Sequence, residues 1–169
     1  MMIYISEDIE EIVRNIVGWN TEGLILIGML HDDYLKIRSK YKKPAVLIDS
    51  YTPKNIARYV NIGLDDEEGG YLMTKYLLDC GHRKIAFLAD NMEGVDYIRY
   101  TGHQRALQEY GLDIDLDNLI VIRPSKYERQ GNMEEIYAVA HKFTAFMCCS
   151  DYYAVTLMKY LKAKGIRFP

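Results

Sequence analysis

The first half of the chain alternates between helical and strand-like spacing of its apolar residues. After Ser6, a favourable N-cap residue, apolar side chains recur at intervals of three and four, which predicts an amphipathic helix. These positions are Ile9, Ile12, Val13, Ile16 and Val17. The run GLILIG at 23–28 is short, continuous and apolar, so we expect a strand that is buried on both faces. A more charged helical segment, 32–43, stops before Pro44 and a second strand, AVLID, at 45–49.

The second half repeats this alternation with longer helices. A brief apolar run at 59–64 precedes DDEEGG, which opens a helix expected over about 66–80. Four acidic residues at its start and three basic or titratable residues after its end match the polarity of a helix dipole. Further strands are predicted at 85–89, 119–122 and 143–149, and further helices before Gly111, around 133–141 and at 151–164.

The triplet Gly81-His82-Arg83 lies between that long helix and the next strand. We interpret Gly81 as the residue with positive φ that follows the helix, and His82 as a cation that interacts with the last helical carbonyls rather than as a general base. Cys80 is interpreted as a buried helix residue rather than a nucleophile. The only basic residue placed to activate its thiol is His82, and His82 faces elsewhere if it binds the end of the helix. The triplet is therefore predicted to turn the chain.

Repeated strand and helix units with short connections indicate an α/β fold with parallel sheets covered by helices. The chain has 169 residues, of which 49% are hydrophobic and 27% charged, which suits one globular domain or two small lobes. A net charge of -3 provides no broad basic field for a phosphate backbone. We therefore do not expect this segment to contact nucleic acid directly.

The three cysteines, Cys80, Cys148 and Cys149, indicate buried thiols in a reducing compartment. Their number is odd, and no spaced set of Cys and His residues suggests a metal site. No run approaches the roughly 20 apolar residues of a membrane span, and the start MMIYISEDIEE lacks the regions of a signal peptide. We expect a cytoplasmic protein that does not contact a membrane and needs neither metal nor cofactor.

The common catalytic signatures of α/β folds are missing from the sequence: GxGxxG after a strand, GxxxxGK[ST], GxSxG and HExxH. Individual polar residues near the carboxyl ends of predicted strands remain candidates, because ligands bind beyond those ends in open α/β sheets. These residues are Asp49, Asp65 and Asp90. Their position makes these residues candidates for a binding site, but three aspartates by themselves do not identify a reaction.

Arg99 lies at the start of the helix that follows strand 85–89, where the helix dipole disfavours a cation. It is either solvated or faces a crevice lined by Asp65 and Ser150, where it could bind a polar ligand bidentately. Asp151 is interpreted first of all as the N-cap of the last helix, and Ser150 stands beside it at the carboxyl edge of the strand.

Three blocks, in this order and at this spacing, resemble the effector-binding domain of LacI/GalR-family bacterial transcription regulators. They are LDDEEGGYLMTKYLLDCGHRKIAFLAD, then RYTGHQRALQEYG from Arg99, then FTAFMCCSDYYAVTLMKYLKAKGIRFP. Upstream, WNTEGLILIG and KKPAVLIDS look like two strands of that family. The resemblance covers Trp19 to Pro169.

The resemblance implies two Rossmann-like lobes in a periplasmic-binding-protein-like arrangement of type I. The partial N-terminal lobe would comprise residues 1–64 and the partial C-terminal lobe residues 65–169. Such domains hold a small molecule, commonly a sugar or a sugar derivative, in the cleft between the lobes. In whole members of the family, effector binding shifts the lobes and changes the DNA affinity of a dimer.

The resemblance also assigns site residues. Arg99 and Gly102 match the R-x-x-G motif, whose arginine commonly contacts the effector. Ser150 and Asp151 occupy the Asn-Asp position before the last helix, with Ser150 replacing a residue often seen at the ligand. Asp65 matches the acidic residue at the lobe crossover. The effector site implied is Arg99, Asp65, Ser150 and Asp151, with no catalytic residue.

The sequence departs from the family at both ends. A helix-turn-helix segment, the first strand and helix of the N-terminal lobe and the strand expected after GIRFP are not present, so DNA would be reached only through a segment outside this sequence. We expect sheet edges to be exposed, which favours a homodimer or another association. The function implied is that of an effector-sensing core. The alternatives are an extracytoplasmic sugar-binding protein, which would carry a signal peptide, and a small α/β enzyme with a perturbed titratable cluster.

Overall fold

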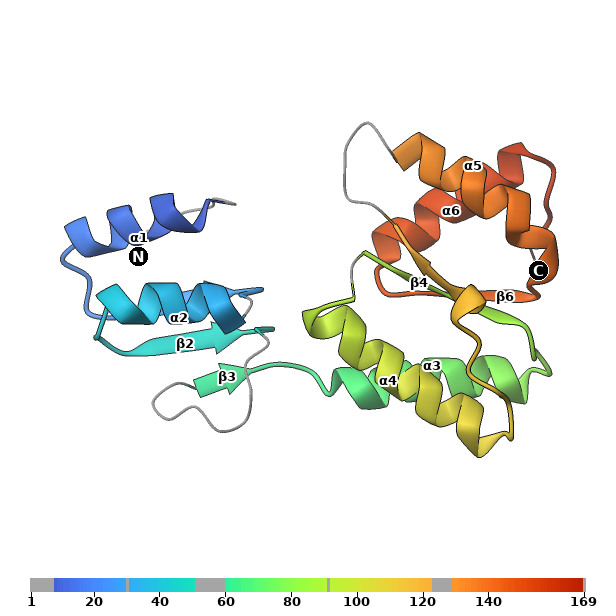
Figure 1. The fold of residues 1–169 in the computed structure, drawn as a ribbon, viewed down its shortest axis with the longest axis horizontal. Helices are drawn as coiled ribbons and strands as arrows, with labels where there is room; N and C mark the ends of the chain where they lie inside the picture. The colour runs from blue at the N-terminus through green and yellow to red at the C-terminus, as the bar shows by residue number, and fades with distance from the viewer. Residues whose placement is uncertain (1–7, 30, 51–59, 91, 123–128, 169) are drawn as a thin grey trace. The chain divides into compact units, whose positions relative to one another are not determined.

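The computed structural model describes residues 8–29, 31–50, 60–90, 92–122 and 129–168. The chain divides into two compact units, Met1–Leu64 and Asp65–Pro169. Each unit contains a three-stranded sheet in which every described strand pair is parallel, with helices packed against it (Figure 1). The α/β class predicted from the alternating periods is confirmed.

The first unit has strand order β1-β2-β3. Its elements are α1 (Ile9–Gly18), β1 (Leu24–Ile27), α2 (His31–Lys40), β2 (Ala45–Ile48) and β3 (Val60–Ile62). Helix α1 is capped by Asp8, whose Oδ1 accepts hydrogen bonds from the amides of Glu10 at 2.9 Å and Glu11 at 3.2 Å. The predicted N-cap, Ser6, is therefore wrong; Ser6 itself lies outside the described residues.

The core of the first unit lies on one face of its sheet. Leu26 and Leu47 are register partners on β1 and β2, and they pack with apolar side chains of α1 and α2. The alternate side chains of β1 are exposed, Ile25 by 64% and Ile27 by 71%. The prediction that 23–28 is buried on both faces is wrong, because helices cover the Leu26 side of the strand and leave the other side open to solvent.

The second unit has strand order β5-β4-β6. Its helices are α3 (Asp66–Asp79), α4 (Gly94–Glu109), α5 (Arg129–Val139) and α6 (Asp151–Ala163), and its strands are β4 (Ile85–Ala89), β5 (Leu119–Val121) and β6 (Ala145–Cys148). A turn of 3-10 helix precedes β5, and another, Ala140–Lys142, follows α5. The boundaries agree with the predicted ones, except that α5 begins at Arg129 rather than near residue 133.

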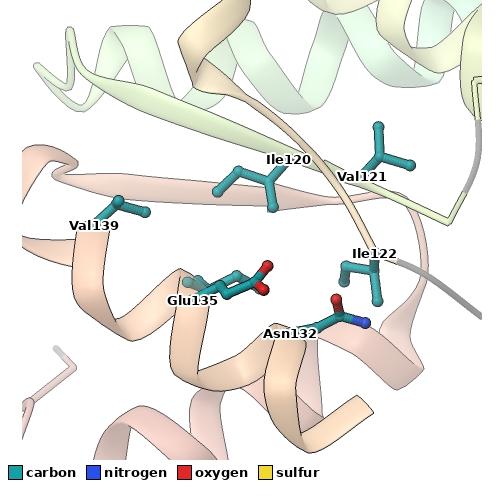
Figure 2. A pocket seen from close by; sticks show the side chains of 7 residues that line it. Ile120, Val121, Ile122, Asn132, Glu135 and Val139 are labelled. Carbon is teal, nitrogen blue, oxygen red and sulfur yellow. The ribbon is translucent and has the colours of Figure 1, made fainter. Parts of the chain in front are cut away.

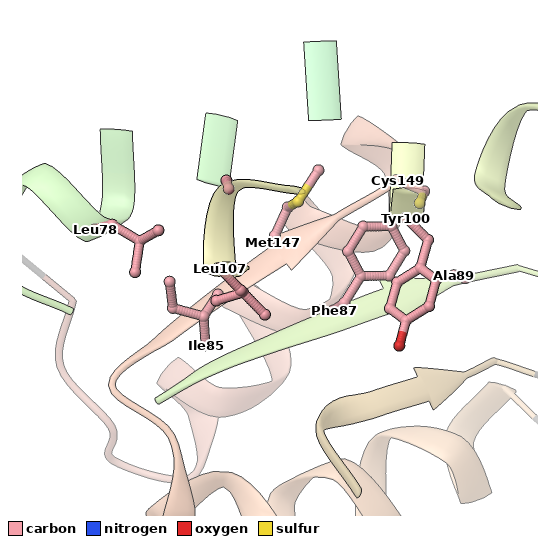
Figure 3. Close-up of a cluster of buried hydrophobic side chains, with 9 residues drawn as sticks. Leu78, Ile85, Phe87, Ala89, Tyr100, Leu107, Met147 and Cys149 are labelled. Atoms are coloured by element: carbon pink, nitrogen blue, oxygen red, sulfur yellow. The ribbon is translucent and has the colours of Figure 1, made fainter. Parts of the chain in front are cut away.

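Two helical layers enclose the sheet of the second unit. All five residues of the central strand β4 are buried. Ile85, Phe87 and Ala89 contribute to the cluster shared with α3 and α4 (Figure 3). Ala86 and Leu88 contribute to the cluster shared with α5 and α6. This period-2 alternation buries β4 on both faces, as expected for a strand inside a covered parallel sheet.

The Gly81-His82-Arg83 triplet ends α3 and turns the chain towards β4. Gly81 has a φ of 92°, and its amide donates to the Leu78 carbonyl at 2.9 Å. Arg83 Nη1 donates to the same carbonyl at 2.9 Å, whereas His82 Nδ1 lies 3.0 Å from Thr144 Oγ1. The predicted turn is confirmed, but the basic residue that binds the end of the helix is Arg83 and not His82.

The cysteines are free thiols. Cys149 packs in the cluster under α3 and α4, and Cys148 packs against the cluster under α5 and α6, so the two neighbours face opposite sides of the sheet. Cys80 is exposed at the end of α3, so its predicted burial is wrong.

Candidate functional site

The strand order of the second unit creates a switch point between β4 and β6. Helix α4 follows β4 and packs on one face of the sheet, whereas α6 follows β6 and packs on the other. The two connections therefore leave adjacent strands in opposite directions, and open α/β sheets bind ligands beyond the carboxyl ends of the strands at such a point. Asp90 follows β4 at this edge, and Cys149 and Ser150 follow β6.

Arg99 reaches this edge from the second turn of α4. Its Nε lies 2.9 Å and its Nη2 2.8 Å from Oδ1 of Asp66, at the start of α3. Its Nη1 donates to the carbonyl oxygen of Cys149 at the end of β6. The Arg99 side chain is 30% exposed and the Asp66 side chain 15% exposed. The guanidinium therefore links α3, α4 and β6 while part of it faces solvent.

The other predicted site residues begin helices at the same edge. Asp65 is exposed and caps α3, since its Oδ1 accepts from the Glu68 amide at 3.1 Å. Ser150 caps α6 through its Oγ, 3.5 Å from the Tyr153 amide. Asp151 is an exposed first residue of α6 rather than its cap, so the predicted capping role of Asp151 is wrong. The cap falls on Ser150 because that residue still has the extended backbone of an N-cap.

A second group of polar side chains lies beside Arg99. The Asp90 amide donates to Asp96 Oδ2 at 2.7 Å, and the Tyr153 hydroxyl donates to Asp90 Oδ1 at 2.6 Å. Burial raises the pKa of the Cys149 thiol, and the negative charge of Asp96 raises it further, whereas Arg99 opposes this increase. The Cys149 thiol is therefore protonated at neutral pH, which excludes it as a thiolate nucleophile.

Two glycines allow α3 and α4 to cross closely enough for the Arg99–Asp66 contact. A Cβ atom on Gly70 would lie 2.1 Å from the Arg99 carbonyl oxygen, and one on Gly102 would lie 1.9 Å from the Glu67 carbonyl oxygen. Both distances are far inside van der Waals contact with backbone atoms. Gly102, the glycine of the R-x-x-G pattern, therefore serves the helix crossing that positions the arginine.

A buried polar pair lies further along the same crossing. Thr74 Oγ1 is 2.8 Å from the Gly70 carbonyl oxygen and 2.9 Å from His103 Nδ1. His103 is only 2% exposed, and burial lowers its pKa to about 4. The imidazole is thus neutral at pH 7, and its contacts are those of a packed core residue.

Sequence reasoning found Arg99, Asp65 and Ser150 at this edge but missed Asp66, Asp96 and Tyr153. In the sequence, Asp66 is one of four acids that match the helix dipole, and only the crossing of α3 over α4 shows that it differs from its neighbours. Asp49, another candidate, lies in the first unit directly after β2, with a φ of 46°.

The described residues also form two apolar hollows that contain none of the predicted site residues. One, of about 220 Å³, lies between β5 and α5 and includes Asn132 and Glu135 as its polar members (Figure 2). The other, of about 380 Å³, is lined by residues of α3 and β6. Within the described part of the chain, no helix is long and apolar enough to span a membrane, and no group of three potential metal ligands is present.

Comparison with known proteins decides the family. The periplasmic binding protein-like domain matches residues 74–169, which is more than half of the chain. The chain belongs to this family. The predicted resemblance to LacI/GalR-type regulators is confirmed by the relatives and solved structures described next.

The curated relatives are transcriptional repressors, not enzymes. The HTH-type transcriptional repressor PurR of Vibrio atlanticus is 36% identical over 115 residues, which cover 62% of this chain and 32% of the relative. The arabinose metabolism transcriptional repressor of Geobacillus stearothermophilus is 31% identical over 129 residues, which cover 67% and 34%. The PurR repressor of Pasteurella multocida is 28% identical over 96% of this chain and 49% of its own length. The chain thus spans a third to a half of the relatives that it matches.

Solved structures of the same kind superpose on most of the chain. The transcription regulator CcpA of Lactococcus lactis has a TM-score of 0.77 at 25% identity and covers 95% of this chain, with 59% of that protein matched. A LacI-type transcriptional regulator from Bacillus cereus subsp. cytotoxis has a TM-score of 0.82 at 21% identity, covering 95% of this chain and 57% of its own. At 21% identity, the similarity to the Bacillus cereus regulator establishes only the fold.

Proposed function

We propose that this chain is the effector-sensing core of a LacI/GalR-type bacterial transcription regulator. Residues 1–64 form the partial N-terminal lobe, and residues 65–169 form the partial C-terminal lobe. The core acts by binding, without catalysis: the effector stabilises one of two conformational states by its differential affinity for them.

The observation that carries this proposal is the place of Arg99. Its guanidinium lies at the switch point between β4 and β6, is held by Asp66 and the Cys149 carbonyl, and keeps 30% of the side chain exposed. A cation that is fixed on two sides and open on a third is pre-organised to donate hydrogen bonds to a ligand. Asp65, Ser150 and Asp151 complete the polar edge around it.

The ligand that fits this edge is a small polyhydroxyl molecule such as a sugar. Aspartate oxygens and guanidinium N–H groups are both present there, and a sugar hydroxyl both donates and accepts. Among similar solved structures, the transcriptional regulator CelR is in complex with cellobiose and a LacI family regulator from Enterococcus faecium holds ribose. These neighbours support a sugar as the first class of effector to test.

The remaining features of the proposal concern the whole protein. DNA is bound by a helix-turn-helix segment outside this sequence, as the names of the PurR relatives suggest. The regulator functions as a cytoplasmic homodimer. The net charge of -3 on this chain favours a sensing role for the segment over direct contact with the phosphate backbone.

The test is thermal unfolding of the purified chain with ribose, arabinose or cellobiose. A ligand at 100 times its dissociation constant stabilises the folded state by about 2.7 kcal/mol, which raises the melting temperature by several degrees. We expect at least one of these neutral sugars to stabilise the chain, and Arg99→Gln to abolish that response.

Arg105→Gln is the matched control, because Arg105 lies on the same helix but pairs at the surface with Glu67 and Glu68. This control should respond to the sugar like the wild-type chain. If the sugar response survives in Arg99→Gln, Arg99 is not part of the site. Hydrolysis or phosphorylation of a sugar by the purified chain would contradict the non-catalytic proposal.

A further inference from the structure

Asp66 occupies two of the hydrogen-bond donors of Arg99. A guanidinium has five N–H donors. The structure directs Nε and one Nη2 donor to Asp66 Oδ1 and one Nη1 donor to the Cys149 carbonyl. Among the described contacts, two donors therefore remain, one on each terminal nitrogen, beside the Asp66 carboxylate. Donors next to a carboxylate suit adjacent hydroxyl groups, which can donate to Asp66 and accept from Arg99.

The charge around Arg99 is negative despite the guanidinium. Asp66 neutralises Arg99 directly at 2.8 Å. Asp96 and Arg99 both interact with the Cys149 thiol, and the Asp90 amide donates to Asp96. One cation and three carboxylates leave a formal charge of -2 in this group. Asp65 and Ser150 each accept a hydrogen bond from the third amide of α3 and α6, so each of those two helix starts offers one donor fewer to an anion.

We propose that Asp66 determines the charge specificity of the effector site: it makes the site accept an uncharged polyhydroxyl ligand and reject the phosphorylated or carboxylated derivatives of that ligand. The inference rests on the proposed function, since it concerns the same site. It adds Asp66, which sequence reasoning left out, and narrows the effector from a sugar or sugar derivative to an uncharged one.

The variant that tests this proposal is Asp66→Asn. The substitution keeps the size of the side chain and one carbonyl oxygen near Arg99 but removes the charge. Helix α3 keeps its cap, because the cap is Asp65. Glu67→Gln is the matched control: it removes the same charge from the next residue of α3, and Glu67 pairs at the surface with Arg105, 2.8 Å away, rather than with Arg99.

The probe is inorganic phosphate, compared with potassium chloride at equal ionic strength so that general screening cancels. Phosphate should raise the melting temperature of the wild-type chain and of Glu67→Gln no more than chloride does. It should raise that of Asp66→Asn by several degrees, with an apparent affinity at least tenfold higher than for the wild type. In Asp66→Asn, the guanidinium of Arg99 is released and binds phosphate. The double variant Asp66→Asn/Arg99→Gln lacks this guanidinium and should therefore lose the phosphate-dependent increase in melting temperature.

Two results would overturn the proposal. One is a phosphate-specific stabilisation of the wild-type chain that Arg99→Gln removes, since Arg99 would then accept anions with Asp66 in place. The other is a folded Asp66→Asn variant without any phosphate gain. If Asp66→Asn does not fold, titration of the wild-type chain and of Arg99→Gln with phosphate by calorimetry still decides the first result. None of these outcomes depends on the sugar response. Failure of this proposal can therefore be distinguished from failure of the proposed function, which the sugar experiment tests.

Discussion

The crossing of α3 and α4 makes a sharp prediction about two adjacent glycines. A Cβ atom on Gly70 would lie 2.1 Å from the carbonyl oxygen and 2.9 Å from the Cα atom of Arg99, whereas a Cβ atom on Gly69 would meet nothing within 4 Å. The obstructing atoms at Gly70 belong to the backbone, so no side-chain rotation relieves the contact. Gly70→Ala requires the two helices to separate by about 1 Å to reach even a tight contact of 3.0 Å.

The magnitude follows from two opposing effects. Overpacking of this kind destabilises proteins by about 1–3 kcal/mol and occasionally more, and the backbone contact places Gly70→Ala at the upper end. Replacing glycine by alanine inside a helix stabilises it by about 1 kcal/mol. We therefore expect Gly70→Ala to lower the free energy of unfolding by about 2 kcal/mol, and Gly69→Ala to raise it by up to about 1 kcal/mol.

Urea unfolding of the wild-type chain and both variants, followed by circular dichroism, measures these changes. The Gly69→Ala variant controls for helix propensity, because it makes the same substitution on the same helix one residue away. Gly102→Ala, whose Cβ atom would lie 1.9 Å from the Glu67 carbonyl oxygen, should behave like Gly70→Ala. Equal unfolding midpoints for Gly70→Ala and Gly69→Ala, with equal slopes, would refute the close crossing and with it the explanation of how Arg99 reaches Asp66.

Two further predictions concern buried titratable groups. His103 has a folded-state pKa of about 4, below the roughly 6.5 of an unfolded chain, so the unfolded state binds its proton first as the pH falls. The free energy of unfolding should therefore be unaffected by His103 above pH 6.5 and should fall by up to about 3 kcal/mol between pH 6.5 and 4. His103→Asn should show a shallower decline when its free energy of unfolding is measured over the same pH range. If the free energies of the wild type and the variant decline in parallel, His103 does not have the lowered pKa. Burial raises the pKa of Cys148 to about 11 and that of Cys149 further, whereas Cys80 is exposed. A thiol reagent should thus modify one cysteine of the native chain quickly and all three after denaturation, and Cys80→Ser should remove the fast phase; a fast phase that persists would show that Cys148 or Cys149 is accessible.

Much of the fold was predictable because it depends on local periodicity. The alternation of apolar positions located the strands of both sheets, and the acidic start and glycine end located α3 within a residue of its boundaries. Boundaries were least accurate at α5, where the polar residues before Met133 extend the helix without contributing to the apolar pattern. An N-cap was also misplaced at both ends of the chain, because serine and aspartate are equally good caps and only backbone geometry selects between neighbours.

The sequence by itself determined the fold class, the parallel sheets, the family and the presence of Arg99 near a strand end. The reason is that apolar periodicity, the residues that start and end helices, and the spacing of motifs can all be read along the chain without knowing its tertiary contacts. Only the tertiary structure decided which side chains meet. The run at 23–28 is equally apolar on both faces, yet helices cover only one of them. Asp65 and Asp66 are chemically identical neighbours, yet one caps a helix and the other neutralises Arg99. Successive residues of a helix point in directions about 100° apart, so the crossing of α4 over α3 determines which carboxylate faces the arginine, and that crossing is a contact between residues more than 30 positions apart.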